Sequence, residues 1–360
     1  MSRVLSVQSH VAFGYVGGKA AVFPLQCLGY DVDVVNTVNF SNHSGYGRFG
    51  GSKADAEELT RIFGLMAQNG LLRSERLLTG YIPSGEALAA VKDMATKLRE
   101  ANPELIYLLD PVLGDAGQLY VAPSVIPVYR AMLPLSTIIT PNWFEVEVLT
   151  DVKIENMSTL RKALKILHDE HKVPNIVMSS IPLKPWLKAA LPSRSRTPPG
   201  SEPSDEDFLL CISSSQNQTG DDAPSIVHAG RVPYISGYFS GVGDLFSAFV
   251  VAHYKPTSPI LQTNSKPLDT ASGETALSRA VSAALTKTHA MLLLTNEYAQ
   301  QLPEEERQPT DDEADEKEAD RRVRRMKGRE LRLIQGQDII RGTQKATERR
   351  MDLWAGFWTS

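Results

Sequence analysis

Residues 239–249 read Phe239-Ser240-Gly241-Val242-Gly243-Asp244-Leu245-Phe246-Ser247-Ala248-Phe249, and the rest of the chain is organised around them. Two glycines and an acid before an apolar run predict a tight turn that leads into a helix. Gly241 and Gly243 lack a Cβ, so the backbone can approach a ligand closely there. The first N–H groups of a helix have no intrahelical partner and carry partial positive charge, which makes them an anion site.

Asp244 allows two interpretations. Its negative charge opposes a bound phosphate, so an acid in an anion site makes sense as a base that takes a proton from a hydroxyl. Alternatively, Asp244 is a capping residue at the start of an ordinary helix. The choice depends on the rest of the chain.

The composition is that of an ordinary globular protein, with 360 residues, 42% hydrophobic and 22% charged. The net charge of −4 gives no electrostatic case for binding nucleic acid. Only Cys27 and Cys211 are present, which fits a reducing compartment rather than a disulfide framework. The first residues lack the apolar stretch of a signal peptide, so we expect none, and no apolar run reaches about 18 residues. We therefore expect a cytoplasmic protein without membrane contact, with the nucleus as a second location left open.

Strands and helices alternate along the sequence. Periodicity predicts helices at 19–28, 53–68, 86–100 and 158–170, and strands at 4–9, 31–40, 77–79, 105–109, 137–139, 175–178 and 330–335. This alternation predicts an α/β fold with a largely parallel sheet, in which ligands bind beyond the carboxyl ends of the strands. The residues just beyond predicted strands are Ser9, Gly80-Tyr81, Asp110, Thr140 and Ser179.

Two segments interrupt this pattern. Residues 184–207 are rich in proline, serine and charge, which predicts a disordered insertion. Residues 301–329 carry a run of acids followed by a run of bases, which predicts a second insertion, a solvated tail or charged helix. Residues 219–224 suggest the tip of a hairpin.

Two strand exits carry acids. Asp110 and Asp115 share a short loop with Pro111 and Gly114, and paired carboxylates of this kind suit Mg²⁺ or act as turn caps. Asn142 and Glu145 follow Thr140-Pro141, and their spacing equally fits a capping box at a helix start. The seven histidines and two cysteines show no zinc-ligand spacing.

The motifs together resemble the pyridoxal kinase family of the ribokinase-like superfamily. They occur in the family's order, across about 3–181 and 226–298 and again at 330–340: Ser6–His10, Phe40–Tyr46, Thr79–Tyr81, Asp110–Asp115, Thr140–Glu145 and Gly241–Asp244. The resemblance implies one kinase domain over residues 1–360, with a mostly parallel central sheet flanked by helices on both faces. It also implies a homodimer that transfers the γ-phosphate of ATP to the 5′-hydroxyl of pyridoxal, pyridoxine or pyridoxamine.

The resemblance also implies roles for single residues. For the B6 vitamer it implies Ser9 at the pyridine nitrogen, Ser44 (usually threonine in the family) near the ring substituents, Tyr81 facing the ring, and Val16 and Phe40 in the apolar pocket. For ATP it implies Asp110, Asn142, Glu145, Ser179, Ser180, Val242 and Gly243. For Mg²⁺ and a monovalent cation such as K⁺ it implies Asp110, Asp115, Thr140 and Glu145, and for catalysis Asp244 with the amides of Gly241 and Gly243. Residues 115–120 resemble the flap that covers the nucleotide.

Two other functions remain open on the sequence alone. One is a related kinase that acts on hydroxymethylpyrimidine or a sugar. The other is a catalytically weak protein that binds B6 vitamers or ATP, because Val242 stands where the family usually has a threonine hydroxyl.

Overall fold

The computed structural model describes residues 2–115, 117–191, 208–217, 223–256, 273–307 and 312–359. Its strands in these ranges form one large sheet and a separate hairpin. In spatial order, the large sheet contains β12 (Asp352–Leu353), β11 (Ser225–Pro233), β10 (Phe208–Gln216), β9 (Asn175–Pro182), β8 (Ile138–Ile139), β5 (Ile106–Leu109), β4 (Arg76–Thr79), β1 (Arg3–Val11), β2 (Asp31–Phe40) and β3 (Gly51–Lys53). The central strands from β9 to β2 are parallel, and the strands outside them are antiparallel.

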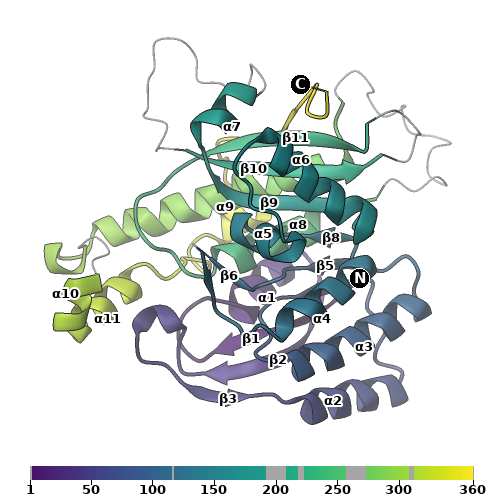
Figure 1. Cartoon of the computed structure of the whole chain (residues 1–360). Coiled ribbons are helices and arrows are strands. Elements are labelled where there is room, and N and C mark those ends of the chain that lie inside the picture. Colours follow the sequence, from purple (N-terminus) through teal and green to yellow (C-terminus); the bar gives the residue numbers. More distant parts are fainter. Residues whose placement is uncertain are drawn as a thin grey trace.

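Apolar side chains leave both faces of the sheet. In β1, Leu5 and Val7 point to one hydrophobic cluster and Val4 to the other, as expected for a period of two in a sheet covered on both sides. One face packs against α1 (Gly18–Cys27), α8 (Val242–His253), α9 (Ala276–Gln300) and α12 (Gln337–Arg341) (Figure 1). The other packs against α2 (Ala56–Gln68), α3 (Gly85–Ala101), α4 (Val125–Met132), α5 (Trp143–Thr150), α6 (Met157–Lys165) and α7 (Pro185–Ala190). The predicted α/β fold with helices on both faces is confirmed.

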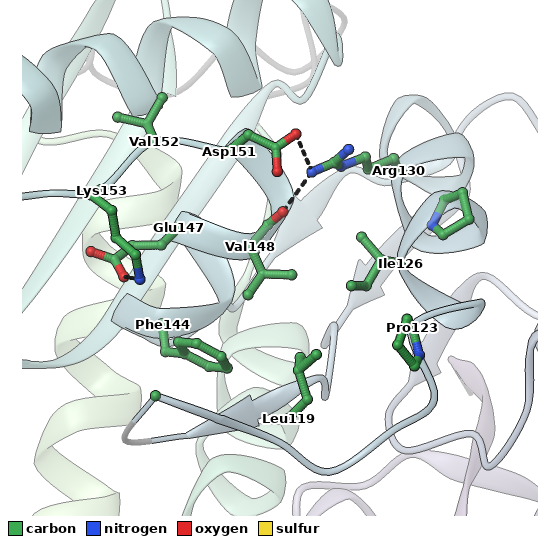
Figure 2. A pocket seen from close by; sticks show the side chains of 12 residues that line it. Leu119, Pro123, Ile126, Arg130, Phe144, Glu147, Val148, Asp151, Val152 and Lys153 are labelled. Carbon is green, nitrogen blue, oxygen red and sulfur yellow. Dashed lines mark hydrogen bonds and ion pairs between the residues drawn. The ribbon is translucent and has the colours of Figure 1, made fainter.

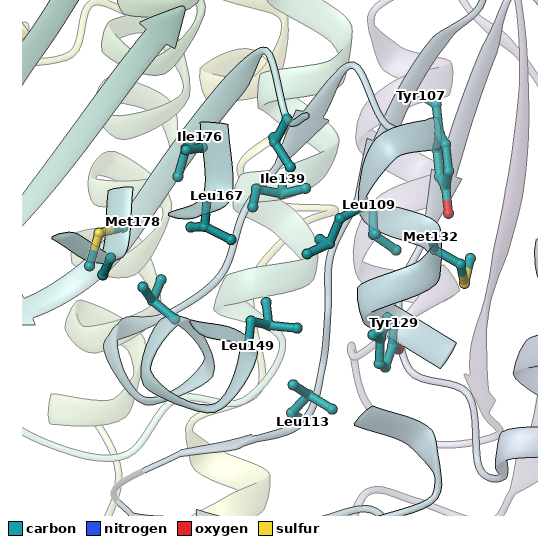
Figure 3. Packing of buried hydrophobic residues seen from close by; sticks show 14 of the residues in the cluster. Tyr107, Leu109, Leu113, Tyr129, Met132, Ile139, Leu149, Leu167, Ile176 and Met178 are labelled. Atoms are coloured by element: carbon teal, nitrogen blue, oxygen red, sulfur yellow. The ribbon is translucent and has the colours of Figure 1, made fainter. Parts of the chain in front are cut away.

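The hydrophobic cluster that contains Leu5 and Val7 reaches the carboxyl ends of the strands (Figure 3). The buried hydroxyl of Tyr107 lies 3.0 Å from Thr79 Oγ1, and the hydroxyl of Tyr129 donates to Gly80 O at 3.2 Å. Buried polar groups are costly unless they are bonded, so these contacts fix the exit of β4 against the core. Tyr81 lies just beyond this end of β4.

The predicted strand at 330–335 is wrong. Leu331 and Leu333 are buried and Ile334 is 45% exposed, an alternation that resembles a strand in the sequence. The backbone turns instead, with Gly336 N–H donating to Arg332 O at 2.8 Å, and Arg332 N–H bonds Thr295 Oγ1 of α9 at 3.1 Å. These leucines pack under α9 and α12, and the last strand is β12. The predicted helix at 53–68 begins at Ala56, because Lys53 ends β3 and Asp55 caps α2. Residues 158–170 are helical as predicted, with a π-helical end at Ile166–Glu170.

Both interrupting segments contain helices within their described residues. Residues 185–190 form α7, and Leu187 is buried in the core, so a disordered insertion cannot begin at Lys184. Residues 192–207 of that segment, and residues 219–222 of the hairpin tip expected at 219–224, lie outside the described residues. β10 and β11 pair antiparallel on either side of that tip.

The charged segment contains η7 (Glu304–Glu306), α10 (Asp312–Lys317) and α11 (Ala319–Gly328), at the left of Figure 1. It is not a simply solvated helix, because Arg325 is 2% exposed and pairs with the buried carboxylate of Asp315, which also pairs with Arg321. α11 packs against the short turn η1 (Ser44–Tyr46). Among the described helices, none is long and apolar enough to cross a membrane.

Candidate active site

The carboxyl ends of the parallel strands meet the first turns of α8. Asp110 follows β5 and Thr140 follows β8, and both are buried. Ser247 of α8 donates to Asp110 Oδ2 at 3.1 Å, and its hydroxyl lies 2.9 Å from Thr140 Oγ1. The predicted strand exits therefore lie beside the helix of the glycine turn.

Two glycine turns meet at Asp244. Gly241 has a φ of 77° and caps α8, and a Cβ there would lie 2.0 Å from Tyr15 O. Gly17 has a φ of 54°, and a Cβ there would lie 2.2 Å from Ser9 Oγ. Its N–H donates to Asp244 Oδ2 at 2.7 Å. Both turns need glycine for conformation and for space, and together they hold the Asp244 carboxylate.

Asp244 is not the capping residue of α8. The cap is Gly241, which makes no side-chain cap bond, and Asp244 is the third helical residue. Its bond to Gly17 joins a loop more than two hundred residues away in the sequence. The geometry favours the interpretation of Asp244 as a functional carboxylate.

The charges of Asp244 and Asp110 raise the pKa of neighbouring carboxyl groups in this region. Burial and then the charge of Asp244 raise the pKa of Asp110 to about 7. Burial and then the charge of Asp110 raise the pKa of Glu145 well above its usual range, and burial raises the pKa of Asp244. A divalent cation nearby would relieve this repulsion, so the donor chemistry fits a hard cation such as Mg²⁺.

The raised pKa of Asp110 predicts a pH-dependent stability. Between about pH 4 and 7 the unfolded chain ionises Asp110 while the folded protein keeps its proton, so the free energy of unfolding falls as pH rises. Asp110→Asn removes this penalty and can still accept from Ser247. We subtract the free energy of unfolding of wild type from that of the variant. This difference should be larger at pH 8 than at pH 4 by on the order of 1–4 kcal/mol. Urea unfolding at both pH values measures it, with the exposed Asp115→Asn as control. An equal difference at both pH values would contradict the prediction.

Both carboxylate oxygens of Glu145 accept hydrogen bonds from backbone N–H groups. Its Oε2 accepts the N–H of Asn142 at 2.8 Å, and its Oε1 accepts the N–H of Leu113 at 2.9 Å. Asn142 accepts from Glu145 N–H in return, completing the capping box of α5, and donates to Gly114 O at 2.7 Å. The capping alternative is therefore correct in geometry. It also ties α5 to the loop after β5.

The proposed metal ligands do not form one ready cluster. Asp115 is exposed on β6 (Gly114–Asp115), which pairs with β7 (Gln118–Leu119) in the hairpin that resembles a flap. Across the described ranges, no three His, Cys, Asp or Glu side chains are arranged to hold a metal ion.

The other predicted residues line the same edge of the sheet or the loops beside it. Val16 lies beside Gly241, and a Cβ on that glycine would be 3.2 Å from Val16 Cα. Phe40 packs edge-to-face against Phe49 with ring centroids 5.7 Å apart. Tyr81 is half-buried, and Ser44 is exposed in η1.

The proposed nucleotide residues follow β8, lie within β9 or begin α8. Because β9 runs to Pro182, Ser179 and Ser180 lie inside the strand and not beyond its predicted end at 178. Ser179 N–H donates to Pro141 O at 3.2 Å, and Ser180 is exposed with a left-handed φ of 53°. Val242 is half-buried at the first position of α8. Gly243 is exposed, and a Cβ there would meet open space.

A pocket of about 630 Å³ lies on the outer side of the flap, between α4, α5 and β7 (Figure 2). Phe144 and Leu119 point into it, and none of the predicted site residues lines it. Arg130 is paired with Asp151 at 2.7 Å and Lys153 with Glu147 at 2.8 Å. The charged side chains that line this pocket are thus paired with one another.

The sequence prediction missed two elements of the site. Ser247 lies three residues after Asp244, so helical spacing could have placed it on the same face. Glu330 was assigned to a strand, yet its carboxylate accepts from Tyr15 N–H at 2.8 Å and Tyr46 Oη at 2.7 Å. These partners are separated by some three hundred residues, and no local pattern indicates them.

Comparison with known proteins agrees with this geometry. Residues 72–185 match the family model described as phosphomethylpyrimidine kinase. The chain is 39% identical to the pyridoxal kinase of Arabidopsis thaliana over 253 residues, 69% of this chain and 73% of that protein. It is 37% identical to human pyridoxal kinase over 257 residues, 69% of this chain and 76% of that protein. Pyridoxal kinase from Leishmania donovani, solved with ADP and pyridoxamine, aligns with a TM-score of 0.72 and 27% identity, covering 98% of this chain and 99% of that chain. The chain belongs to the pyridoxal kinase family of the ribokinase-like superfamily.

Proposed function

We propose that this protein is an ATP-dependent pyridoxal kinase, which phosphorylates the 5′-hydroxyl of pyridoxal, pyridoxine or pyridoxamine. The observation that carries this function is the Asp244 carboxylate, held by Gly17 N–H at the start of α8 and beside the buried Asp110. Related structures support the substrates, because the Leishmania donovani enzyme was solved with ADP and pyridoxamine and with ADP and pyridoxine.

In this proposal Asp244 is the base. Burial raises its pKa, but a carboxyl group remains far more acidic than an alcohol. Asp244 therefore accepts the proton of the 5′-hydroxyl late, as that oxygen bonds to phosphorus. The Gly17 N–H bond fixes the carboxylate for this transfer, which is worth roughly 10²–10⁴-fold in rate.

The amides before the first α8 helical bond provide the anion hole. That bond joins Leu245 N–H to Gly241 O at 3.0 Å, so the N–H groups before Leu245 have no intrahelical acceptor and point out of the N-terminal end of the helix. The amides around Gly241 and Gly243 stabilise the charge that develops on the transferred phosphoryl group. A flap at 115–120 would exclude water and limit ATP hydrolysis.

The metal and nucleotide assignments are part of the proposal. Asp110, Asp115, Thr140 and Glu145 would hold Mg²⁺ and a monovalent cation such as K⁺, which neutralise phosphate charge when bound with ATP. Their support is the mutual repulsion of the buried carboxylates. Asn142, Ser179, Ser180, Val242 and Gly243 would contact the nucleotide.

The vitamer assignments rest on the resemblance and on position. Ser9 faces Gly17, the residue that holds Asp244, so a hydroxyl for the pyridine nitrogen lies close to the base. Val16, Phe40, Ser44 and Tyr81 are proposed as the remaining walls of the vitamer site. We also propose a single domain over residues 1–360, in the cytoplasm or nucleus.

An ATP-coupled assay with the three vitamers tests the function. We expect turnover with at least one of them in the presence of Mg²⁺. The second candidate is a hydroxymethylpyrimidine kinase, favoured by the family model that matches residues 72–185. Hydroxymethylpyrimidine therefore belongs in the panel, and a clear preference for it over every vitamer would overturn the proposal.

Val242 predicts a weakened anion hole. Threonine has nearly the same shape and adds a hydroxyl beside the phosphates. A hydrogen bond to a charged group is worth roughly 1.5–3 kcal/mol, so Val242→Thr should raise kcat/KM for ATP by about tenfold. Steady-state kinetics at saturating pyridoxal measures this, with Val242→Ala as the control that adds no hydroxyl. No gain in an already fast enzyme would show that the hydroxyl is dispensable.

The homodimer predicts a defined mass in solution. Phe13 and Phe49 are 48% and 49% exposed near the β3 edge of the sheet, and a second copy of the chain could cover them. Light scattering should give twice the chain mass of 39.6 kDa. A monomer at micromolar concentration would contradict the prediction.

A further inference from the structure

Glu330 is a buried acid that the mechanism above does not use. Its side chain is 7% exposed, and it collects three donors from two distant loops. Tyr15 N–H donates to Oε2 at 2.8 Å, while Tyr46 Oη and His43 Nε2 lie 2.7 Å and 3.1 Å from Oε1. Burial alone would raise the pKa of Glu330, but these bonds outweigh it and leave the pKa below its usual value. The charged Glu330 carboxylate is therefore the centre of a hydrogen-bond network that joins these two loops.

His43 extends this network to the glycine turn of α8. Gly45 N–H donates to its Nδ1 at 3.1 Å, so Nδ1 is the acceptor and Nε2 carries the proton toward Glu330. Ser240 Oγ lies 3.3 Å from the same Nδ1. Ser240 immediately precedes Gly241, the cap of α8.

The three loops tied together are those that build the proposed site. The first contains Tyr15, whose carbonyl packs on Gly241, and Gly17, whose N–H holds Asp244. The second loop contains Ser44. The third loop contains Ser240 and leads into Gly241 and the proposed anion hole. Glu330 bonds the first two loops directly and reaches the third through His43 and Ser240, and it bonds none of the proposed reacting groups.

The charged segment delivers Glu330 to this position. Arg322 Nε donates to Gly45 O at 2.7 Å, and the Arg329 guanidinium lies 5.8 Å from the centre of the Phe239 ring. Residues 319–330 thus cover the loops at 43–47 and 237–240. This contact buries Arg329 of a segment that looks solvated in the sequence.

We propose that Glu330 is a positioning residue of the kinase, which aligns the loops holding Asp244, Ser44 and Gly241. This inference rests on the proposed function. It acts through hydrogen-bond geometry: glutamine at 330 would keep one acceptor oxygen, and its amide donors could not accept the N–H of Tyr15. A shift of about 1 Å in a catalytic constellation can cost about 10²-fold in rate.

Kinetics on the full-length protein test this role. Glu330→Gln should lower kcat with pyridoxal by about 10–100-fold and change KM for ATP less than threefold. Glu316→Gln, an exposed acid of the same segment, is the matched control and should keep wild-type kinetics. In the Asp244→Asn background Glu330→Gln should lower kcat by a smaller factor than in wild type, because the alignment of Asp244 no longer contributes to the rate. Equal losses in both backgrounds would indicate a general folding defect and overturn the inference.

Hydrogen exchange separates this inference from the proposed function. In Glu330→Gln we expect faster amide exchange in peptides spanning 12–18 and 42–48, with unchanged exchange in α3. Unchanged exchange in those loops would overturn the inference even if the wild type is an active kinase. An inactive wild type would overturn the proposed function, while the exchange result still decides whether Glu330 holds the loops.

Discussion

Replacing Asp244 by asparagine should lower kcat with pyridoxal by roughly 10²–10⁴-fold and leave KM for ATP nearly unchanged. The amide oxygen of asparagine can still accept from Gly17 N–H, so the two glycine turns keep their bond. What is lost is the basic carboxylate that takes the proton of the 5′-hydroxyl. The variant isolates proton transfer from binding.

Stability provides an internal control for this variant. The charge of Asp244 contributes to the raised pKa of Asp110, so removing it relieves repulsion in the folded protein. Asp244→Asn should therefore unfold at the same temperature as wild type or higher at pH 8. Steady-state kinetics and calorimetry on the same sample measure both effects. A folded variant that keeps more than a tenth of wild-type kcat would remove Asp244 from the role of base.

Local patterns predicted most of the sheet. The strand at 31–40 matches β2 at both ends, because its β-branched residues and the glycine before it leave few alternatives. Buried strands with continuous apolar runs, such as β5, were also found, because an acid or turn follows each of them. The error at Leu331 and Leu333 arose because period-two burial also occurs in a turn packed under a helix.

The site was predictable only where its parts are local. The glycine turn at 241–243 and the capping pair Asn142 and Glu145 are encoded within a few residues. The Glu330 network is not, because it joins side chains that the chain order separates widely. For Glu145, the spacing to Asn142 fitted a cap and the resemblance implied a metal ligand, and the hydrogen bonds of its two oxygens show the capping role.

Gly243→Ala should lower kcat/KM for ATP by roughly 10²–10³-fold without loss of stability, because it crowds the anion hole. A Cβ at Gly243 meets no protein atom within 4 Å, so the methyl group fits the protein itself. Alanine is also a better helix former than glycine, by about 1 kcal/mol. The added methyl would instead occupy the space before the α8 amides, where the transferred phosphoryl group is proposed to bind.

Gly241→Ala is the contrasting variant. Its φ of 77° disfavours alanine, and the new Cβ would lie 2.0 Å from Tyr15 O, so this protein should lose stability and activity together. Thermal unfolding and ATP-dependent kinetics on both variants distinguish the two causes. If Gly243→Ala keeps wild-type kcat/KM, no phosphoryl group binds against these amides and the anion hole lies elsewhere. If it unfolds as readily as Gly241→Ala, the space before α8 is needed for folding rather than for a ligand.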